Sequence, residues 1–281
     1  MVNRRTITAA LLALGVMAMP MTAMAQSPLM ATAPKEIAPT EPLADVPRNQ
    51  TVVLGWGVSA GSPIGVTNPW ALPGYTHQEG NAFMWEPLMY FAIFKGEYVP
   101  WPADSMEYTD DTFTALEIKL NPMATWSDGV PVTAEDVKFT FDGQLNNNKL
   151  PYNAHFTQFV ESTEIVDDKT VMVKFKAPAP RFKFEVLTEK FDTGIPIVPA
   201  HYLSKQPDVN MAPGQLEMPH SGPYDLKAWN ANQKIYDYRP DWWAVKAGRI
   251  AEPAVKRVII ANILGVSMDT VAQRIVNNEF D

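Results

Sequence analysis

The stretch that decides the fold reads Trp126-Ser127-Asp128-Gly129-Val130-Pro131-Val132-Thr133-Ala134-Glu135-Asp136-Val137-Lys138-Phe139. Asp128-Gly129 predicts a tight turn, because glycine accepts the positive φ that many turns require. Thr133 has the chemistry of a helix N-cap. Asp136 follows it at the capping-box position, where Glu or Gln is more usual. The stretch therefore predicts a turn followed by the start of a helix.

The helix expected after Thr133 carries its apolar residues on one side. Val137, Phe141 and Leu145 are spaced at i, i+4 and i+8, as on the buried face of an amphipathic helix. A carboxylate beside a tryptophan could also indicate catalysis. Because turn, cap and helix account for every residue here, we interpret the stretch as a scaffold and not as an active site.

The N-terminal residues 1–25 are typical of a secretory signal peptide. Arg4 and Arg5 precede the apolar run Ile7–Met19, and Ala23-Met24-Ala25 supplies the small-residue cleavage pattern. The apolar run is shorter than a membrane-spanning helix. We therefore expect export, cleavage after Ala25 and a periplasmic location.

The composition of the chain limits the classes of protein to which it can belong. The chain has 281 residues, 46% of them apolar, which suffices for one large core or two smaller ones. The formal net charge is −8 without a basic run, so nucleic acid is not the expected partner. The chain has no cysteine and only four widely spaced histidines, so we expect no disulfide, no metal and no cofactor.

Short elements are expected along the rest of the chain, after a Pro- and Ala-rich leader at 26–50 that predicts disorder. Strands are expected at 51–56, 112–120, 159–166, 170–175, 224–229, 233–238 and 255–261. Besides the helix after Thr133, helices are expected at 81–91, 181–191, 199–203 and 270–277. This mixture predicts a mixed α/β fold in more than one lobe.

Six blocks, in order, resemble the peptide/nickel-type solute-binding proteins of bacterial ABC importers. They are Glu86-Pro87-Leu88-Met89-Tyr90, Ser105–Tyr108 with Thr112–Leu120, Trp126–Val137, His220-Ser221-Gly222-Pro223-Tyr224, Tyr238–Trp243 and Asn277–Asp281. Three positions depart from the family pattern: His220 and Asn278 stand where the family has glycine, and Pro240 follows Arg239 without the usual Asn.

The resemblance implies a periplasmic-binding-protein-like clamshell of the three-domain peptide-binding type. Lobe I would comprise residues 51–84 and 190–265, an inserted domain II residues 85–189, and residues 266–281 the start of lobe III. Family members continue beyond this length, so we expect lobe III to be missing and apolar surface of lobe I to be exposed. A chain that lacks one wall of the cleft should bind its solute weakly. The Trp126–Phe139 stretch would lie in domain II, away from the cleft.

The function that the resemblance implies is solute capture in the periplasm. The protein would act as a monomer, without catalysis, and deliver a small solute to ABC permease subunits at the inner membrane. A peptide is the expected solute. An oligosaccharide is the alternative, because eight Trp and nine Tyr suit stacking on sugar rings.

Candidate ligand-binding residues lie in loops that follow the lobe I strands and at the family's Gly-Pro-Tyr loop. They are Trp56, Ser59, Asn68, Trp70, Glu79, Asn81 and His220. Core packing is the competing interpretation for the tryptophans, and a surface or hinge position for His220.

One short motif points to a different class of protein. Gly57-Val58-Ser59-Ala60-Gly61 matches the nucleophile elbow of hydrolases, which requires a helix directly after the serine. The glycines and prolines that follow oppose such a helix, so a secreted hydrolase is the less favoured alternative.

Overall fold

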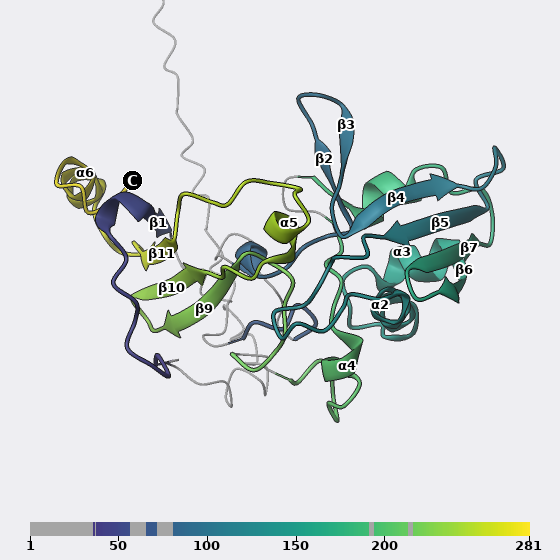
Figure 1. Ribbon diagram of the computed structural model, residues 1–281, viewed down its shortest axis with the longest axis horizontal. Helices are drawn as coiled ribbons and strands as arrows, with labels where there is room; N and C mark the ends of the chain where they lie inside the picture. Colours follow the sequence, from purple (N-terminus) through teal and green to yellow (C-terminus); the bar gives the residue numbers. More distant parts are fainter. Residues whose placement is uncertain (1–35, 37, 57–65, 72–80, 191–193, 213–215) are drawn as a thin grey trace, which may run out of the picture.

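The computed structural model describes residues 36, 38–56, 66–71, 81–190, 194–212 and 216–281 (Figure 1). The predicted signal peptide lies outside these residues, as do Ser59 and Glu79. Two separate groups of strands are visible, one around β1 and β9–β11 and the other around β4–β7.

The first sheet joins distant parts of the sequence in the order β1-β11-β10-β9. Its strands are β1 (Thr51–Trp56), β9 (Tyr224–Trp229), β10 (Gln233–Tyr238) and β11 (Arg257–Asn262). β1 pairs parallel with β11, while β10 pairs antiparallel with β9 and β11. The pairing of β1 with β11 shows that the intervening chain leaves this sheet and returns to it. We call this sheet and its connections lobe I.

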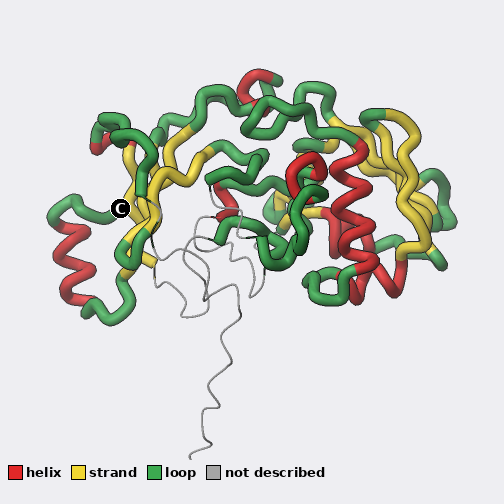
Figure 2. The backbone as a smooth tube through the Cα atoms, turned by 90° about the horizontal axis from the view of Figure 1, so that it is seen from below, coloured by secondary structure: helices red, strands yellow, loops and turns green. Residues whose placement is uncertain are grey.

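The second sheet is wholly antiparallel and local, with the order β4-β5-β7-β6. Its strands are β4 (Ala103–Tyr108), β5 (Ala115–Leu120), β6 (Val160–Asp167) and β7 (Thr170–Phe175). Helices α2 (Ala134–Asn146) and α3 (Asn153–Phe159) lie beside it (Figure 2). Val137 and Phe141 of α2 are fully buried and Leu145 packs against the same core, as the helical spacing predicts. We call this part the inserted domain.

The start of α2 confirms the expectation drawn from the opening stretch. Asp136 Oδ2 accepts a hydrogen bond from the backbone N–H of Thr133 at 2.8 Å, which closes the capping box. Gly129 has a φ of 83°, as a tight turn requires. The same carboxylate also accepts from the Trp126 indole at 3.2 Å and the Ala200 N–H at 2.8 Å. One carboxylate therefore joins turn, helix and a distant loop.

A third, small sheet in the order β3-β2-β8 corrects two helix predictions. Its strands are β2 (Met89–Ala92), β3 (Glu97–Pro100) and β8 (Thr188–Glu189). The helix expected over 81–91 is only the 3₁₀ turn η3 (Asn81–Phe83), because Pro87 interrupts it and β2 pairs with β3 and β8. The helix expected over 181–191 is only the π-helical turn η4 (Lys183–Leu187), because β8 forms the parallel pair with β2.

Short helical elements complete the described chain: η1 (Arg48–Gln50), α4 (Ala200–Leu203), α5 (Trp243–Lys246) and α6 (Met268–Val276). The expected helix at 199–203 is confirmed, with Pro199 as its N-cap residue. Ser267 caps α6, because its Oγ accepts a hydrogen bond from the Thr270 N–H at 3.2 Å. None of the helices in the described ranges is long and apolar enough to cross a membrane.

Part of the proline-rich leader is tied to lobe I. Arg257 donates to the carbonyl of Ala44 at 3.2 Å. Arg48 donates to the carbonyl of Thr51 at 2.8 Å and pairs with the carboxylate of Asp281 at 3.1 Å. Residues 44–48 are therefore attached by two arginines, a type of contact that proline content does not reveal.

Two chain segments cross between lobe I and the inserted domain. Residues 84–88 lead out of lobe I and residues 194–199 lead back, and they pair through Pro87 and Pro196. The outgoing segment is also attached to lobe I, because the Gly222 N–H donates to the Met84 carbonyl at 2.8 Å. On the other side, the Ala103 N–H donates to the Leu88 carbonyl at 3.0 Å. This crossing is the joint between the two parts.

Candidate functional site

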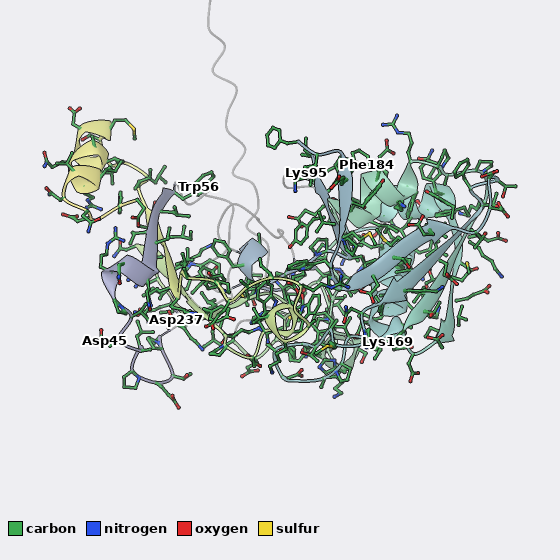
Figure 3. All side chains as sticks on the ribbon, turned by 45° about the horizontal axis from the view of Figure 1, so that its top comes forward. Asp45, Trp56, Lys95, Lys169, Phe184 and Asp237 are labelled. Atoms are coloured by element: carbon green, nitrogen blue, oxygen red, sulfur yellow. The ribbon has the colours of Figure 1, made fainter. Side chains whose placement is uncertain are left out.

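Among the predicted site residues whose side chains the structure describes, Trp56 is the one exposed to solvent. It ends β1 opposite Asn262 of β11, and 46% of its surface is exposed (Figure 3). β1 and β11 are parallel, so their carboxyl ends meet at this edge of the sheet, where ligands bind in open α/β sheets. The indole offers a flat apolar face that suits a peptide side chain or a sugar ring.

Further apolar side chains are exposed on the elements next to Trp56. Leu54 is on the same face of β1 as Trp56, because strand side chains alternate between faces. We define the apolar rim as Leu54, Trp56, Leu264, Met268, Ile275 and Val276, each of them exposed. None of the residues of α6 is buried, although the helix is amphipathic. Leu54, Trp56 and Leu264 lie in the expected lobe I, and the other three lie in the segment expected to begin lobe III. Exposed apolar surface typically marks an interaction site.

The outer edge of β1 is fastened by the last residues of the chain. The Val53 N–H donates to the Asp281 carboxylate at 2.8 Å, and the Asp281 N–H donates to the Val53 carbonyl at 3.0 Å. A Cβ on Gly55 would lie 3.3 Å from the Phe280 ring, so glycine lets this ring pack closely on the strand. These contacts fix the strand that carries Trp56.

Asn68 and Trp70 are structural, which corrects their assignment as ligand-binding residues. They are only 1% and 3% exposed, so a solute cannot reach them in this arrangement. The Asn68 amide donates to the carbonyls of Val209 and Ala212, both at 2.8 Å. The Trp70 ring stacks on Phe139 of α2 with 5.4 Å between ring centroids. The competing interpretation of core packing therefore applies to Trp70.

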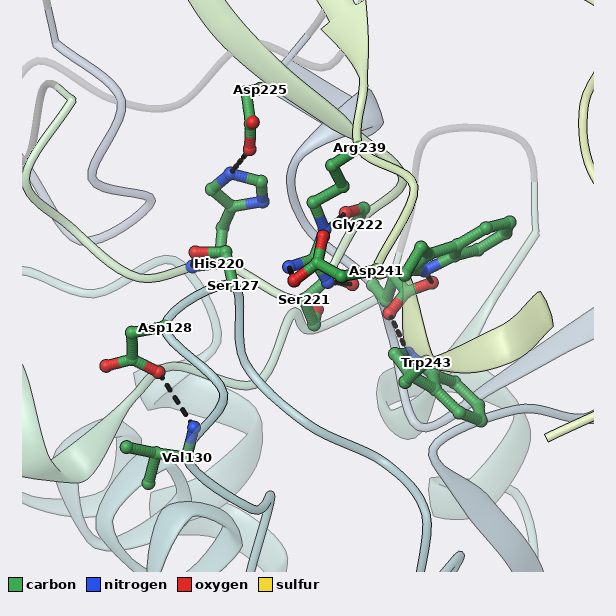
Figure 4. A network of polar contacts seen from close by, with 12 residues as sticks. Ser127, Asp128, Val130, His220, Ser221, Gly222, Asp225, Arg239, Asp241 and Trp243 are labelled. Atoms are coloured by element: carbon green, nitrogen blue, oxygen red, sulfur yellow. Dashed lines mark hydrogen bonds and ion pairs between the residues drawn. The ribbon is translucent and has the colours of Figure 1, made fainter. Parts of the chain in front are cut away.

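His220 is also buried, in a loop that touches both parts of the molecule. Its Nε2 lies 3.0 Å from an Asp225 carboxylate oxygen (Figure 4). Its backbone N–H donates to Ser127 Oγ at 3.1 Å, and its carbonyl accepts from the Ser127 N–H at 2.7 Å. The Trp126–Phe139 stretch therefore lies directly against the His220 loop.

The electrostatics around His220 favour a neutral ring beside a charged carboxylate. Burial lowers the pKa of His220. Burial would raise the pKa of Asp225, but the hydrogen bond from His220 and the Lys227 ammonium at 3.1 Å hold it at about 2. A neutral His220 then donates from Nε2 to Asp225. Its Nδ1 makes no hydrogen bond of standard geometry among the described residues, although the Met84 backbone is close enough to raise the pKa of the ring.

A cavity of about 470 Å³ lies next to His220, at the end of the lobe I sheet opposite Trp56. Its walls include Ser127, His220, Asp225 and the leader at 39–44. The register places Asp225 and Asp237 beside Arg257 and Thr51, one strand length away from Trp56 (Figure 3). Trp56 and His220, predicted as members of one site, are therefore not brought together.

Two predicted site residues, Ser59 and Glu79, lie outside the described residues, and Asn81 is described only as the backbone start of η3. Within the described part of the chain, acidic and histidine side chains form no group of three or more that could hold a metal ion. Among the predicted residues whose side chains are described, Trp56, Asn68, Trp70 and His220, only Trp56 combines exposure with a place at the carboxyl end of the parallel strands.

The residues that surround His220 and Glu86 could not be read from local sequence patterns. Asp225 and Lys227 alternate along β9, a spacing that places both on one face, but nothing in it indicates His220. Glu86 entered only as part of a family motif, although its carboxylate proves to be buried under three tryptophans. The Trp242-Trp243 pair was the available signal, since paired indole N–H groups need acceptors when they are buried.

Comparison with known proteins gives a family match over residues 97–281, to the bacterial extracellular solute-binding proteins, family 5 Middle. A relative named as a peptidoglycan-binding protein, YepA of Agrobacterium fabrum, is 32% identical over 142 residues, which are 50% of this chain and 22% of the relative.

Solved structures of the same type are also similar. The mannohexaose-bound periplasmic oligopeptide-binding protein of Thermotoga maritima has a TM-score of 0.72 at 24% identity, over 84% of this chain and 42% of that one. The oligopeptide-binding protein AppA of Bacillus subtilis, in complex with a nonapeptide, has a TM-score of 0.65 at 18% identity, over 83% and 44%. At these identities the likeness shows the fold, and the chain spans less than half the length of either structure.

Proposed function

Because the chain belongs to the bacterial extracellular solute-binding proteins of family 5, we propose that it serves as the substrate-binding component of an ABC importer. In this role it captures a small solute in the periplasm and hands it to permease subunits of the inner membrane. The family and the similar structures consist of binding proteins and not of enzymes. The family match over residues 97–281 is the observation that carries the proposal.

The solute contacts the apolar rim, with Trp56 as the main contact from lobe I. Trp56 stands at the carboxyl end of β1 and β11 with 46% of its surface exposed, whereas Asn68 and Trp70 are inaccessible. An exposed indole costs free energy in water unless a partner covers it. Covering it with one face of a bound solute recovers that free energy.

A peptide is the proposed solute class, with an oligosaccharide as the alternative. One similar structure holds a nonapeptide and another holds mannohexaose, and both belong to proteins named for oligopeptides. A relative is named for peptidoglycan, a polymer that combines sugars with short peptides. A flat indole serves both chemistries, so the solute has to be separated by experiment.

Titration calorimetry with three probes tests this proposal: a mixture of tri- to nonapeptides, mannohexaose and a muropeptide. The 281-residue chain should bind one of them more weakly than micromolar, because the walls described enclose little of a solute at Trp56. Trp56→Ala should remove the residual heat. Phe94→Ala is the matched control, since Phe94 is a fully exposed aromatic on the β2–β3 hairpin.

Three outcomes would contradict parts of the proposal. Micromolar or tighter binding by the 281-residue chain would refute the expected weakness. Unchanged binding by Trp56→Ala would remove the apolar rim as the contact. Cleavage of a peptide or oligosaccharide during incubation, detected by mass spectrometry, would replace the binding protein with the hydrolase alternative.

A further inference from the structure

The cavity beside His220 has no part in the solute contact proposed at Trp56. Its volume of about 470 Å³ falls within the range of small-molecule pockets, about 300–1,000 Å³. The edge strand β9 forms one of its walls and the leader at 39–44 another. These walls combine apolar side chains with a few polar groups, as ligand pockets typically do. The cavity therefore has the size and the kind of lining that a small molecule requires.

Two opposite charges of β9 stand side by side in the wall of this cavity. The ammonium of Lys227 donates to one carboxylate oxygen of Asp225 at 3.1 Å, and His220 Nε2 lies 3.0 Å from the other oxygen (Figure 4). An ammonium has three donors and a carboxylate accepts about four hydrogen bonds. The contacts within the described residues use one donor of Lys227 and two acceptor positions of Asp225. Both groups therefore retain capacity to bind a molecule in the cavity.

The backbone of β9 adds a donor and an acceptor between these two charges. The Arg239 N–H donates to the Pro223 carbonyl at 3.0 Å, so Pro223 directs its carbonyl toward the chain that continues β10. Antiparallel pairing alternates along a strand, so Asp225 also directs its backbone groups to β10, whereas Leu226 directs its N–H and C=O to the outer edge. β9 is the last strand of this sheet in the described residues, and Leu226 lines the cavity.

The rest of the wall is largely apolar, and one of its remaining two carboxylates is compensated. Asp237 accepts two hydrogen bonds from Arg257, at 2.6 and 2.7 Å. Glu41 of the leader is exposed and adds one negative charge at the rim of the cavity. The apolar lining comes from Leu43, Met84, Leu216 and Leu226 together with two prolines of the leader. Room for an apolar side chain therefore lies next to the charged pair.

The spacing of the two charges selects the chemistry of the ligand. Lys227 and Asp225 are 3.1 Å apart, and a free α-amino acid carries its carboxylate and its ammonium on a single carbon atom. Its carboxylate can therefore pair with Lys227 while its ammonium pairs with Asp225. An extended peptide of three or more residues separates its termini by roughly 3.3–3.6 Å per residue, too far for both to reach this pair. A neutral sugar has neither charge.

We propose that the cavity beside His220 is a second binding site, for a free zwitterionic α-amino acid with an apolar side chain. Lys227 binds the carboxylate and Asp225 binds the ammonium. The backbone of Leu226 supplies further hydrogen bonds, and the apolar wall takes the side chain. The leader covers one side of the site, where the Ala44 carbonyl accepts from Arg257 at 3.2 Å. This site is separate from Trp56 and does not depend on which solute binds there.

Saturation-transfer NMR titrations of the whole chain test the site with L-leucine and two analogues. N-acetyl-L-leucine lacks the ammonium, and L-leucine methyl ester lacks the carboxylate. Leucine should bind with a dissociation constant that is roughly millimolar or lower. Each analogue should bind at least about tenfold more weakly, because it loses a hydrogen bond between charged groups. Absence of saturable leucine binding, or an analogue that binds as tightly as leucine, would overturn the proposal.

Three variants assign leucine binding to this cavity. Lys227→Gln should weaken it at least about tenfold. Lys174→Gln is the matched control, because Lys174 is a similarly exposed, ion-paired lysine on β7 of the inserted domain, and it should leave leucine binding unchanged. Trp56→Ala should also preserve leucine binding, which separates this site from the proposed solute contact.

Unchanged leucine binding by Lys227→Gln would refute the assignment, and so would its loss in Trp56→Ala, which would place leucine at the apolar rim instead. Circular dichroism checks that each variant is folded. If Lys227→Gln does not fold, the two analogues decide with the original chain.

Discussion

The inserted domain and the β1–α6 side of lobe I use similar residues in opposite ways. In the inserted domain, α2 buries Val137 and Phe141 completely, and its capping carboxylate is shared among three separate elements. On the other side, α6 is amphipathic but buries no residue, and Trp56 and Leu54 face water. The apolar face of α2 is therefore covered by the core, while that of α6 is left exposed.

Physically, the difference follows from which contacts are local. The strands β4–β7 pair antiparallel with one another within residues 103–175, and α2 packs onto them from the same stretch, so most partners of these strands are close in sequence. β1 instead pairs with β11 from the far end of the chain. The free energy of the inserted domain should therefore respond strongly to core changes, and that of the β1–α6 side weakly.

The largest effect is expected for Phe141→Ala in the inserted domain. The Phe141 side chain is completely buried, and the centre of its ring lies 5.2 Å from that of Phe156. Removing the ring leaves a cavity and should lower the free energy of unfolding by about 3–5 kcal/mol. Urea denaturation followed by circular dichroism measures it. Leu264→Ala, at a side chain 68% exposed, is the matched control on the other side. Equal losses of unfolding free energy in the two variants would contradict the expected difference between the two regions.

The joint between the two regions should show a smaller, pH-dependent effect. Glu86 has a pKa of about 7 in the folded chain against 4.5 in the unfolded chain. Its favourable contribution to the free energy of unfolding is therefore complete below pH 4.5 and is lost as the pH rises to about 7. This contribution amounts to roughly 3 kcal/mol. Burial lowers the pKa of His220. Its contribution to the free energy of unfolding is therefore lost as the pH falls below 6.5, so its pH dependence is opposite to that of Glu86. The difference between the original chain and Glu86→Gln, from urea titrations at several pH values, isolates Glu86. A pH-independent difference would contradict it.

The shared capping carboxylate should contribute less than the core ring. The described hydrogen bonds to the Asp136 carboxylate all come from donors: the N–H and hydroxyl of Thr133, the Ala200 N–H and the Trp126 indole. Asp136→Asn would turn an amide donor toward one of these donors and should cost about 2 kcal/mol. Thermal unfolding should reveal a lower midpoint. Asp269→Asn, in the first turn of α6, is the counterpart in the other region, and its midpoint should stay within about a degree of that of the original chain.

The smallest effect is expected on α6. Val276 is 78% exposed at the end of this helix, so Val276→Ser removes no buried area and should change the free energy of unfolding by less than about 0.5 kcal/mol. Urea denaturation is again the measurement. A loss above about 1.5 kcal/mol would mean that Val276 packs against something in solution and that α6 is not an open surface.

The sequence predicts an element well when its contacts are with residues nearby in sequence, and poorly when its partners are distant in sequence. The strands β1, β9 and β10 match the expected residues, because alternation and turn residues are local signals. The helices expected at 81–91 and 181–191 fail for a common reason: β2 pairs with β3 and with the distant β8, and this pairing is not visible in either segment alone. Among site residues, Trp56 could be placed at a strand end, but the burial of Asn68 and Trp70 depends on distant loops and on Phe139.

The sequence by itself determined the turn and capped helix at Trp126–Phe139, most strands and the family, because each depends on neighbours a few residues apart or on ordered motifs. Only the tertiary structure decided that Trp56 and His220 lie at opposite ends of one sheet, and that three indoles enclose Glu86. Those contacts join residues from separate chain segments. Burial and pKa depend on everything that surrounds a group, which no local pattern records.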